Sequence, residues 1–302
     1  MEKVFIQKIF QITERILRRD MADDVALREL KAHLKKAQQM NFQQYEVEVL
    51  NTLGILYSMQ EDVLQAKEYW MEALEKVKHI DEPDLSVKLL NNLSSLLLDM
   101  WAVEEAIEYA ERGLSIVQQH QMKTLTTLYI YGTITACHMA LGRYKQAEEV
   151  YKIFWVIAHE TTLHRYSRYE YAQIITTIHE TRVQLDIVAR DDAAFQSNIK
   201  TLASFVEQMN RNDFSDSLLI QGLYYALIVH NDESAARIWE LNLLQRHPEG
   251  LRLTQLLPLT NFLFYNQQLT WAKKYAQQIL DYGEDAFVPP AIIARAQEIV
   301  GA

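Results

Sequence analysis

The sequence contains little glycine and proline and almost no cysteine. Its 302 residues include eight glycines, five prolines and one cysteine, Cys137. Average usage would make glycine and proline about 12% of a chain. The turns that a strand-rich protein needs are therefore too few, and the composition predicts a mostly helical fold. A single cysteine excludes an internal disulfide and a zinc site built from several cysteines, and it fits a reducing compartment.

Long apolar runs and a leader sequence are lacking as well. No stretch approaches the roughly 18 uncharged apolar residues that a membrane-spanning helix needs. Residues 1–20 alternate apolar and charged side chains at helical spacing and contain no small-residue cleavage site, which argues against a secretion signal. Because 49% of the residues are hydrophobic, the chain can bury a large core. We therefore expect a soluble, cytoplasmic protein without membrane contact.

Positive charge is scarce in one part of the chain. The net charge is −10, and residues 41–120 hold five Lys and Arg against fifteen Asp and Glu, whereas residues 1–40 are net positive. An acidic surface repels phosphate backbones, so direct nucleic-acid binding is not expected. A basic or mixed protein or peptide is the better partner. The basic N-terminal helix could also meet the acidic segment of a second copy, which would give a homo-oligomer.

Small residues recur at a fixed period. Ala26, Ala66, Ala106 and Ala147 follow one another at spacings of 40, 40 and 41 residues, each in the first turns of an expected helix. A period of this size indicates one helical hairpin copied in tandem. The small residue marks the point where two helices cross closely, and larger side chains fill the space beside it.

Two segments carry a recognisable family pattern. LNTLGILYSMQEDVLQAKEYWMEAL has Leu-Gly, an aromatic residue three positions on, and then Ala, aromatic, Ala; ALGRYKQAEEVY has Gly-x-Tyr-x-x-Ala. The sequence resembles the tetratricopeptide repeat (TPR) family. Its period of about 40 residues is longer than the family's usual repeat and is similar to the repeats of kinesin light chains and of bacterial signalling regulators. The resemblance implies a right-handed α-solenoid that binds partners rather than catalyses a reaction.

The second half of the chain is more degenerate. The position in register after Ala147 is Asn198, so extra residues enter within the segment 158–178. We expect one array over residues 1–302, an all-α solenoid of about six to seven helical hairpins closed by a C-terminal capping helix. Its parts are regular repeats in 1–157, an irregular insertion in 158–178, degenerate repeats in 179–283 and the capping helix in 284–302.

The repeat register predicts a binding surface. In the TPR family the first helix of each hairpin lines the concave groove, and the position of Asn92 contacts a bound peptide. An asparagine amide offers two donors and an acceptor, so it can hold an extended backbone of any sequence. The alternative is that the asparagines hydrogen-bond neighbouring helices only. The predicted binding residues are Glu48, Asn51, Ile55, Lys88, Asn91, Asn92, Ser95, Tyr129 and Thr133.

The best-known TPR ligand mode does not fit. The clamp that holds the carboxylates of chaperone C-termini needs lysines, asparagines and an arginine on successive first helices. Asn92 matches, but the other positions hold Asn51, Ile55, Tyr129 and Thr133. The cationic pair is missing, and the sequence therefore argues against a chaperone-tail adaptor.

Candidate chemical sites are weak. His159 and His164 frame a segment like the zinc-protease motif, but they are five residues apart, whereas that motif needs a spacing of four to place both on one helical face. Cys137 lies among core-type residues and is interpreted as a buried, inert thiol. We expect neither an enzyme nor a cofactor or metal site.

Two functions follow from these expectations. The first is a non-enzymatic interaction module that binds a protein or peptide in its concave groove. The second is a peptide-sensing signalling regulator that acts through a separate effector chain, because residues 1–40 already follow the repeat register and leave no room for a DNA-binding domain. If the groove does not bind, the convex face or the aromatic insertion with Tyr166, Tyr169 and Tyr171 becomes the expected contact surface.

Overall fold

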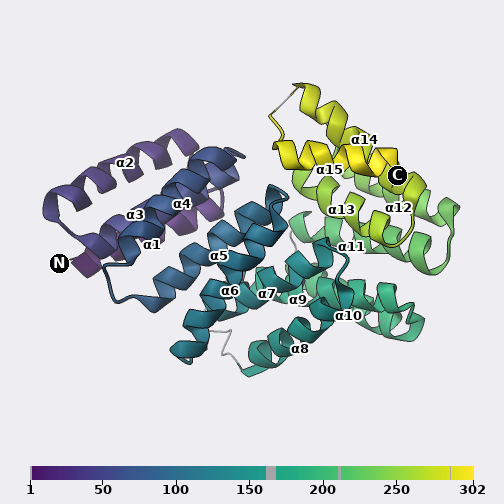
Figure 1. Cartoon of the computed structure of the whole chain (residues 1–302), viewed down its shortest axis with the longest axis horizontal. Coiled ribbons are helices and arrows are strands. Elements are labelled where there is room, and N and C mark those ends of the chain that lie inside the picture. The colour runs from purple at the N-terminus through teal and green to yellow at the C-terminus, as the bar shows by residue number, and fades with distance from the viewer. Residues whose placement is uncertain (1, 161–167, 210–211, 286) are drawn as a thin grey trace. The chain divides into compact units, whose positions relative to one another are not determined.

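The computed structural model describes residues 2–160, 168–209, 212–285 and 287–302, and over these residues it contains fifteen α-helices and no strand (Figure 1). Consecutive helices form seven hairpins, followed by a terminal helix. The helix pairs are α1 (Glu2–Leu17) with α2 (Asp23–Met40), α3 (Gln43–Met59) with α4 (Val63–Val77), α5 (Pro83–Asp99) with α6 (Val103–Gln119), α7 (Leu125–Ala140) with α8 (Tyr144–Glu160), α9 (Arg168–Ala189) with α10 (Asp192–Met209), α11 (Asn212–Tyr224) with α12 (Glu233–Arg246), and α13 (Leu253–Tyr265) with α14 (Leu269–Asp285). The terminal helix is α15 (Pro290–Gly301), and a π-helical turn, η2 (Tyr225–Val229), extends α11.

This arrangement confirms the predicted all-α solenoid of hairpins with a C-terminal helix. The four alanines that mark the repeat, Ala26, Ala66, Ala106 and Ala147, are all completely buried, as expected for residues where two helices cross. Cys137 is also buried. None of the helices in the described part of the chain has the length and apolar character needed to span a membrane.

The turns inside the hairpins explain how the chain folds with so little glycine. Backbone angles in the left-handed region occur after the first helix of successive hairpins, at Glu61, Trp101, Gly142 and Arg190. Only one of these four residues is a glycine, although a left-handed angle costs other residues roughly 1 kcal/mol or more. The tandem repeat therefore imposes the turn geometry on non-glycine residues.

The chain divides into two compact units. The first unit comprises residues 1–100 and 104–130, and the second comprises 101–103 and 131–302. The expectation of one uninterrupted array over residues 1–302, with its four parts, stays a prediction.

The first unit is held by the crossing of α3 and α4. Gly54 on α3 lies against the indole of Trp70 on α4, and a Cβ at position 54 would lie 2.4 Å from Trp70 Nε1. Trp70 packs in the same apolar cluster as Leu85 and Leu89 of α5. Glycine is needed here for the close approach of the two helices.

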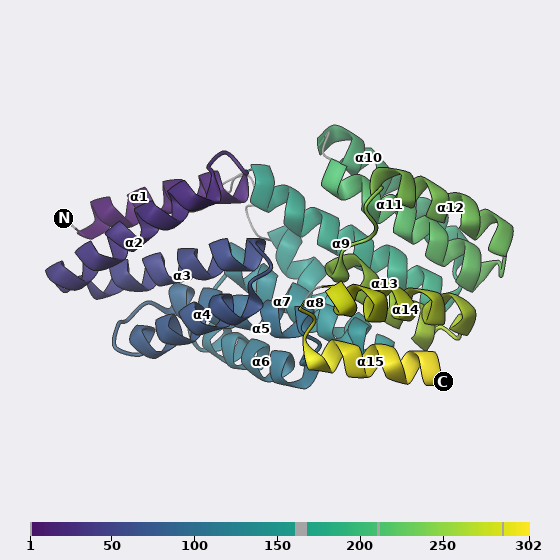
Figure 2. The same cartoon turned by 90° about the horizontal axis from the view of Figure 1, so that it is seen from above.

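The second unit contains contacts between segments that are far apart in the sequence. Asn266, just after α13, donates to the hydroxyl of Tyr144 at the start of α8 over 2.7 Å. Gly142, in the turn before α8, lies against the ring of Tyr265. Arg295 on α15 donates to Asn261 on α13 over 2.7 Å. The last hairpin and α15 are therefore tied to each other and to the turn before α8 (Figure 2).

Candidate functional site

The predicted binding residues of the first unit lie on α3, α5 and α7. Glu48, Asn51 and Asn91 are nearly buried, whereas Ile55, Lys88, Asn92, Ser95 and Tyr129 are half-buried. Thr133 is also half-buried and lies one turn after Tyr129 on α7, in the part of that helix that belongs to the second unit. The half-buried side chains are accessible to a ligand, and the nearly buried ones can only position them.

Asn51 is the centre of a hydrogen-bond network. Its Oδ1 accepts from Asn92 Nδ2 over 2.8 Å and from Trp70 Nε1 over 3.2 Å, and Trp70 Nε1 also reaches the Asn51 backbone carbonyl over 3.1 Å. Asn51 is only 3% exposed. Its amide oxygen thus joins α3 to α4 and to α5, as the alternative interpretation of the asparagines proposed.

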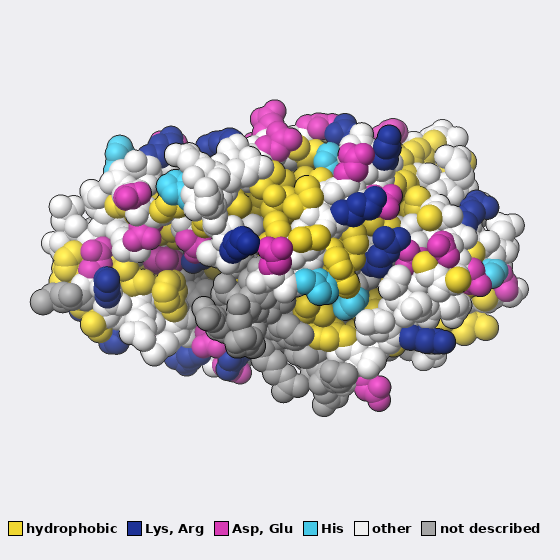
Figure 3. Space-filling model, turned by 90° about the horizontal axis from the view of Figure 1, so that it is seen from below, with side chains coloured by type: hydrophobic (Ala, Val, Ile, Leu, Met, Phe, Trp, Pro, Cys, Tyr) yellow, Lys and Arg dark blue, Asp and Glu magenta, His cyan; other side chains and the backbone are white. Residues whose placement is uncertain are grey.

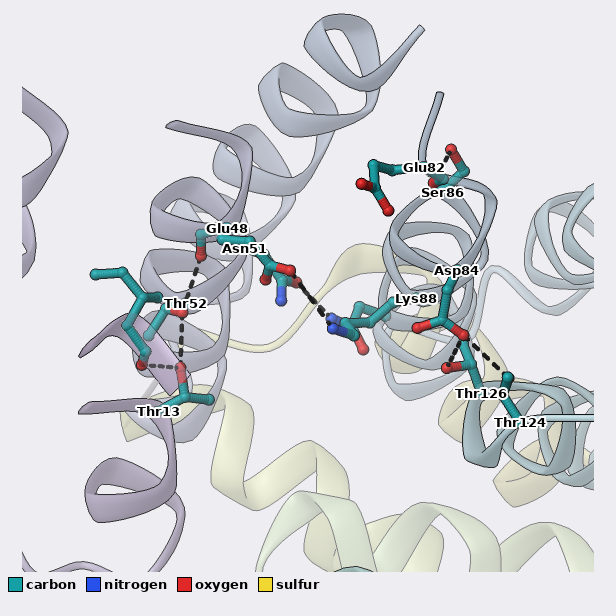
Figure 4. Close-up of polar contacts among 12 residues, drawn as sticks. Thr13, Glu48, Asn51, Thr52, Glu82, Asp84, Ser86, Lys88, Thr124 and Thr126 are labelled. Carbon is teal, nitrogen blue, oxygen red and sulfur yellow. Dashed lines mark hydrogen bonds and ion pairs between the residues drawn. The ribbon is translucent and has the colours of Figure 1, made fainter. Parts of the chain in front are cut away.

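Glu48 and Lys88 form an ion pair between α3 and α5 (Figure 4). Glu48 Oε1 lies 3.8 Å from Lys88 Nζ, and the carboxyl side chain is 6% exposed against 33% for the lysine. Burial raises the pKa of Glu48, Lys88 acts in the opposite direction, and the negative charges of Asp84 and Glu82 raise the pKa further. Three carboxyl groups, those of Glu48, Glu82 and Asp84, thus lie near Lys88 at this end of the surface.

Further polar contacts join the neighbouring first helices. Thr13 of α1 and Thr52 of α3 share a hydrogen bond of 2.8 Å between their hydroxyl groups. Asp84 of α5 accepts from the hydroxyls of Thr124 and Thr126, each over 3.0 Å (Figure 4). The first helices α1, α3, α5 and the start of α7 are thus linked in sequence order by polar side chains, which fixes the surface they form.

Sequence reasoning missed Phe10 as a part of this surface. Phe10 on α1 is 47% exposed, and Lys88 Nζ lies 5.4 Å from the centre of its ring. Phe10 precedes Asn51 by the same 41 residues that separate Asn51 from Asn92 and Asn92 from Thr133. The repeat register alone indicates position 10 as equivalent to Asn51 and Asn92. The position was missed because the N-terminal copy has an aromatic side chain where the next two copies have asparagine.

We call the residues Phe10, Ile55, Lys88, Asn92, Ser95 and Tyr129 the inner surface of the first unit. The surface combines an exposed ring, a lysine and an amide, with Glu48 and Asp84 behind them. Such a set can hold an extended chain by hydrogen bonds and apolar contacts. In the described residues no three His, Cys, Asp or Glu side chains lie close enough together to bind a metal ion.

The second unit has an apolar cavity of about 510 Å³ between α10, α11, η2 and α12. Tyr225 and Phe195 stack on its wall with ring centres 3.7 Å apart, and Trp239, which lies against Gly222, is 37% exposed. Large apolar side chains are exposed nearby on α12, at Ile238 and Leu241. Figure 3 shows apolar side chains among charged ones on one face of the molecule.

The alternative contact surface in the insertion lies outside the described residues. His164 and Tyr166 are not described, and Tyr169 and Tyr171 belong to the first turn of α9, whose side chains are not described either. His159, at the end of α8, packs against Trp155 with ring centres 4.2 Å apart.

Comparison with known families adds a decisive observation. Residues 12–169 match the family model of the RNPP family C-terminal domain. The chain belongs to the RNPP family. This is a TPR-like helical-repeat family, and the matched range contains all nine predicted binding residues. A finer likeness to kinesin light chains stays a prediction. A search of curated proteins finds no match.

Solved structures share the fold. BtubC (BKLC) from P. vanneervenii aligns with a TM-score of 0.55 and 15% identity, over 77% of this chain and 94% of that one. Aspartyl phosphate phosphatase F from Bacillus subtilis aligns with a TM-score of 0.62 and 12% identity, over 96% and 68%. A Rap protein complexed with competence and sporulation factor aligns with a TM-score of 0.58 and 13% identity, over 99% and 97%. At these identities the likeness shows the fold alone.

Proposed function

We propose that this RNPP-family chain is a non-enzymatic regulator that binds an extended peptide on the inner surface of its first unit. The observation that carries the proposal is the placement of Phe10, Lys88 and Asn92, which lie half-buried or exposed on helices joined by hydrogen bonds. Membership of the RNPP family supports it. So does the fold shared with a Rap protein that was solved with competence and sporulation factor.

Asn92 supplies the expected backbone contact. One N–H of its amide group donates to Asn51 Oδ1, and this bond orients the side chain. An amide has a second N–H and an oxygen, and these can pair with the C=O and N–H of one ligand residue. Asn51 is then a positioning residue, and Asn92 is the residue that touches the peptide.

The charges around the surface favour a peptide with basic residues. Glu48, Glu82 and Asp84 place three carboxyl groups beside Lys88, and residues 41–120 are strongly acidic. Phe10 and Ile55 offer apolar contact beside this acidic region. Complementary charge speeds association and selects among ligands more than it raises affinity.

The regulatory part of the proposal is that the bound peptide changes the activity of a separate effector chain. The phosphatase activity named for one similar structure is not carried over, because 12% identity establishes only the fold. A cytoplasmic location stays a prediction.

The experiment captures peptides from the source cell. The low-molecular-weight peptide fraction is passed over the immobilised full chain, and the retained peptides are identified by mass spectrometry. We expect a small set of linear peptides with basic residues, retained by the wild type and by the control Lys78→Glu, which changes an exposed lysine at the end of α4. Asn92→Ala should lose them. Equal retention by all three proteins, or no retained peptide, would overturn the proposal.

A further inference from the structure

The lining of the apolar cavity in the second unit extends over about two turns of each of two helices. On α10 the lining residues run from Phe195 to Ala203, and on α11 and η2 they run from Leu218 to Tyr225. At a rise of 1.5 Å per residue, each stretch is roughly 10–12 Å long. The cavity volume of about 510 Å³ lies within the range of roughly 300–1,000 Å³ that small-molecule sites have. The space is therefore long and large enough for a chain-like molecule.

Aliphatic side chains from both helices contribute to the lining. Ile199 and Ala203 of α10 and Leu218 and Leu219 of α11 line the cavity, and all four are half-buried. Walls of this kind offer water no hydrogen bond, so their cover by an apolar ligand is favourable. The aliphatic part of the lining therefore fits a hydrocarbon ligand.

The aromatic side chains of the lining already contact other parts of the chain. Phe195 and Tyr225 stack with ring centres 3.7 Å apart and nearly parallel planes, and His230 makes an edge contact with Tyr225. The indole of Trp239 lies against Gly222. A flat aromatic ligand would have to displace these contacts in order to stack. A flexible alkyl chain can fill the space along the rings without displacing them, so the lining favours a chain over a ring.

The polar side chains of the lining, Gln196 and Arg246, are exposed and bonded within the chain. Gln196 Nε2 donates to the hydroxyl of Tyr225 over 3.1 Å, and this hydroxyl donates to Asp192. Arg246 Nε donates to Asp216 Oδ1 over 2.6 Å. A charged or hydrogen-bonding group that entered the cavity would exchange water for apolar side chains, which is unfavourable. The group that enters is therefore apolar, and a polar head group stays at the exposed rim.

We propose that the cavity between α10, α11, η2 and α12 binds the alkyl chain of a free, lipid-like small molecule, whose polar head group lies at the rim beside Gln196 and Arg246. The π-helical turn η2 begins in the cavity wall, at Tyr225, and such turns frequently occur at functional sites.

This cavity and the inner surface of the first unit share no residue, and the inference goes beyond the proposed function. The exposed side chains Ile238 and Leu241 of α12 do not belong to the lining. The proposal therefore rests on the lined space and not on the exposed apolar face of α12, and the two can be tested separately.

The test titrates n-octyl-β-glucoside, below its critical micelle concentration, into the full chain. Nuclear magnetic resonance follows the indole N–H signals of the five tryptophans, and Trp239→Phe identifies the signal of Trp239. We expect this signal to shift saturably and the signal of the buried Trp70 to stay unchanged. Methyl-β-glucoside has the same head group without the chain and should cause no shift. Phenyl-β-glucoside carries a ring instead and should bind more weakly than the octyl compound; tighter binding would overturn the assignment to an alkyl chain.

Variants separate the cavity from the exposed surface. Ala203→Leu fills part of the cavity and should weaken binding of n-octyl-β-glucoside about tenfold or more, because it occupies the volume that the chain needs. Ala193→Leu makes the same change at an exposed position of α10 and should bind like the wild type. Leu219→Gln places an amide in the wall and should also weaken binding, which keeps the test decisive if Ala203→Leu fails to fold.

A last variant tests the outer face of α12. Ile238→Ser removes an exposed apolar side chain outside the lining and should bind like the wild type. Loss of binding in Ile238→Ser alone would show that the alkyl chain adsorbs to this face, and it would overturn the inference. Absence of a saturable shift, or equal binding by the wild type, Ala203→Leu and Leu219→Gln, would overturn it as well.

Discussion

Two tryptophans show how one contact behaves differently in the two units. Trp70 lies against Gly54 in the first unit, and Trp239 lies against Gly222 in the second; a Cβ on either glycine would come within 2.4 Å and 2.5 Å of the respective indole. Trp70 is 4% exposed and donates to Asn51. Trp239 is 37% exposed and lines the apolar cavity.

The difference lies in what surrounds the indole. Trp70 belongs to one buried apolar cluster with Leu85 and Leu89 of the next hairpin, so it lies in a packed core. Beside Trp239, α11 continues into the π-helical turn Tyr225–Val229, and such turns often occur at functional sites. The α3–α4 hairpin is thus a fixed support for the inner surface, whereas the α11–α12 hairpin has spare volume and is expected to open more readily.

Adding a methyl group at the two crossings should give the largest contrast. Gly54→Ala places Cβ against the fixed Trp70, and we expect a loss near the upper end of the roughly 1–3 kcal/mol that overpacked cores show. Gly222→Ala should cost less, because Trp239 can move toward the cavity. Urea unfolding of both variants measures the two losses in the free energy of unfolding. Gly132→Ala is the control, since its Cβ would lie 3.5 Å from Phe154, an ordinary contact. Equal losses at positions 54 and 222 would refute the contrast.

A larger residue at a crossing and in the cavity should have different effects. Ala66 is completely buried where α3 and α4 cross, and Ala66→Leu should cost about 2 kcal/mol. Ala203 lines the cavity, so Ala203→Leu has space for the added carbons and should be neutral or slightly stabilising. Thermal melting compares the two. A similar fall in melting temperature for both would show that the cavity does not accept a side chain.

The two units also contain carboxyl groups with raised pKa values. The pKa of Glu180 rises from the ordinary 4.5 to about 7, so the folded chain binds more protons than the unfolded chain in that range. Stability should therefore fall as pH rises from about 4.5 to 7, on the order of 1–2 kcal/mol. Glu180→Gln should remove most of this decline, whereas Glu207→Gln, which changes an exposed glutamate on α10, should keep it. Melting curves across this pH range measure the decline. If stability falls with pH as steeply in Glu180→Gln as in the wild type, Glu180 is not the cause of the decline.

Removing the indole nitrogen should give the smallest contrast. Trp70→Phe loses the hydrogen bonds to Asn51 and should cost about 1 kcal/mol beyond its loss of packing. Trp239→Phe changes a partly exposed ring and should cost less. Chemical unfolding of the two variants measures how much free energy of unfolding each one loses. If Trp239→Phe is the more damaging variant, the cavity wall is more tightly held than its exposure suggests.

The repeat period was sufficient to predict the first four hairpins. A small residue every 40 or 41 residues marks the crossing in each of them, and Ala26, Ala66, Ala106 and Ala147 are all buried as the pattern requires. Local sequence carries this information because the same crossing is repeated along the chain. The terminal helix was predictable for a similar reason, since Pro289 and Pro290 precede an amphipathic run.

The partners of individual side chains were not predictable in the same way. The period places Asn51 and Asn92 at one repeat position, but only the packed structure shows that the Asn51 oxygen serves Trp70 and Asn92 together. Phe10 fills the equivalent position without sharing its chemistry. Glu180 was missed because its environment depends on α11, which the degenerate second half of the sequence does not align with the clear repeats.

The most direct test of peptide binding is calorimetric titration of a peptide recovered from the wild-type chain. It is titrated into the wild type, Asn92→Ala and the control Leu241→Ala, an exposed residue on α12, with melting measured for each protein. We predict about tenfold weaker binding per folded molecule for Asn92→Ala, as expected from lost hydrogen bonds, and unchanged binding for Leu241→Ala. Unchanged affinity in Asn92→Ala would show that the peptide does not bind the inner surface of the first unit through this amide.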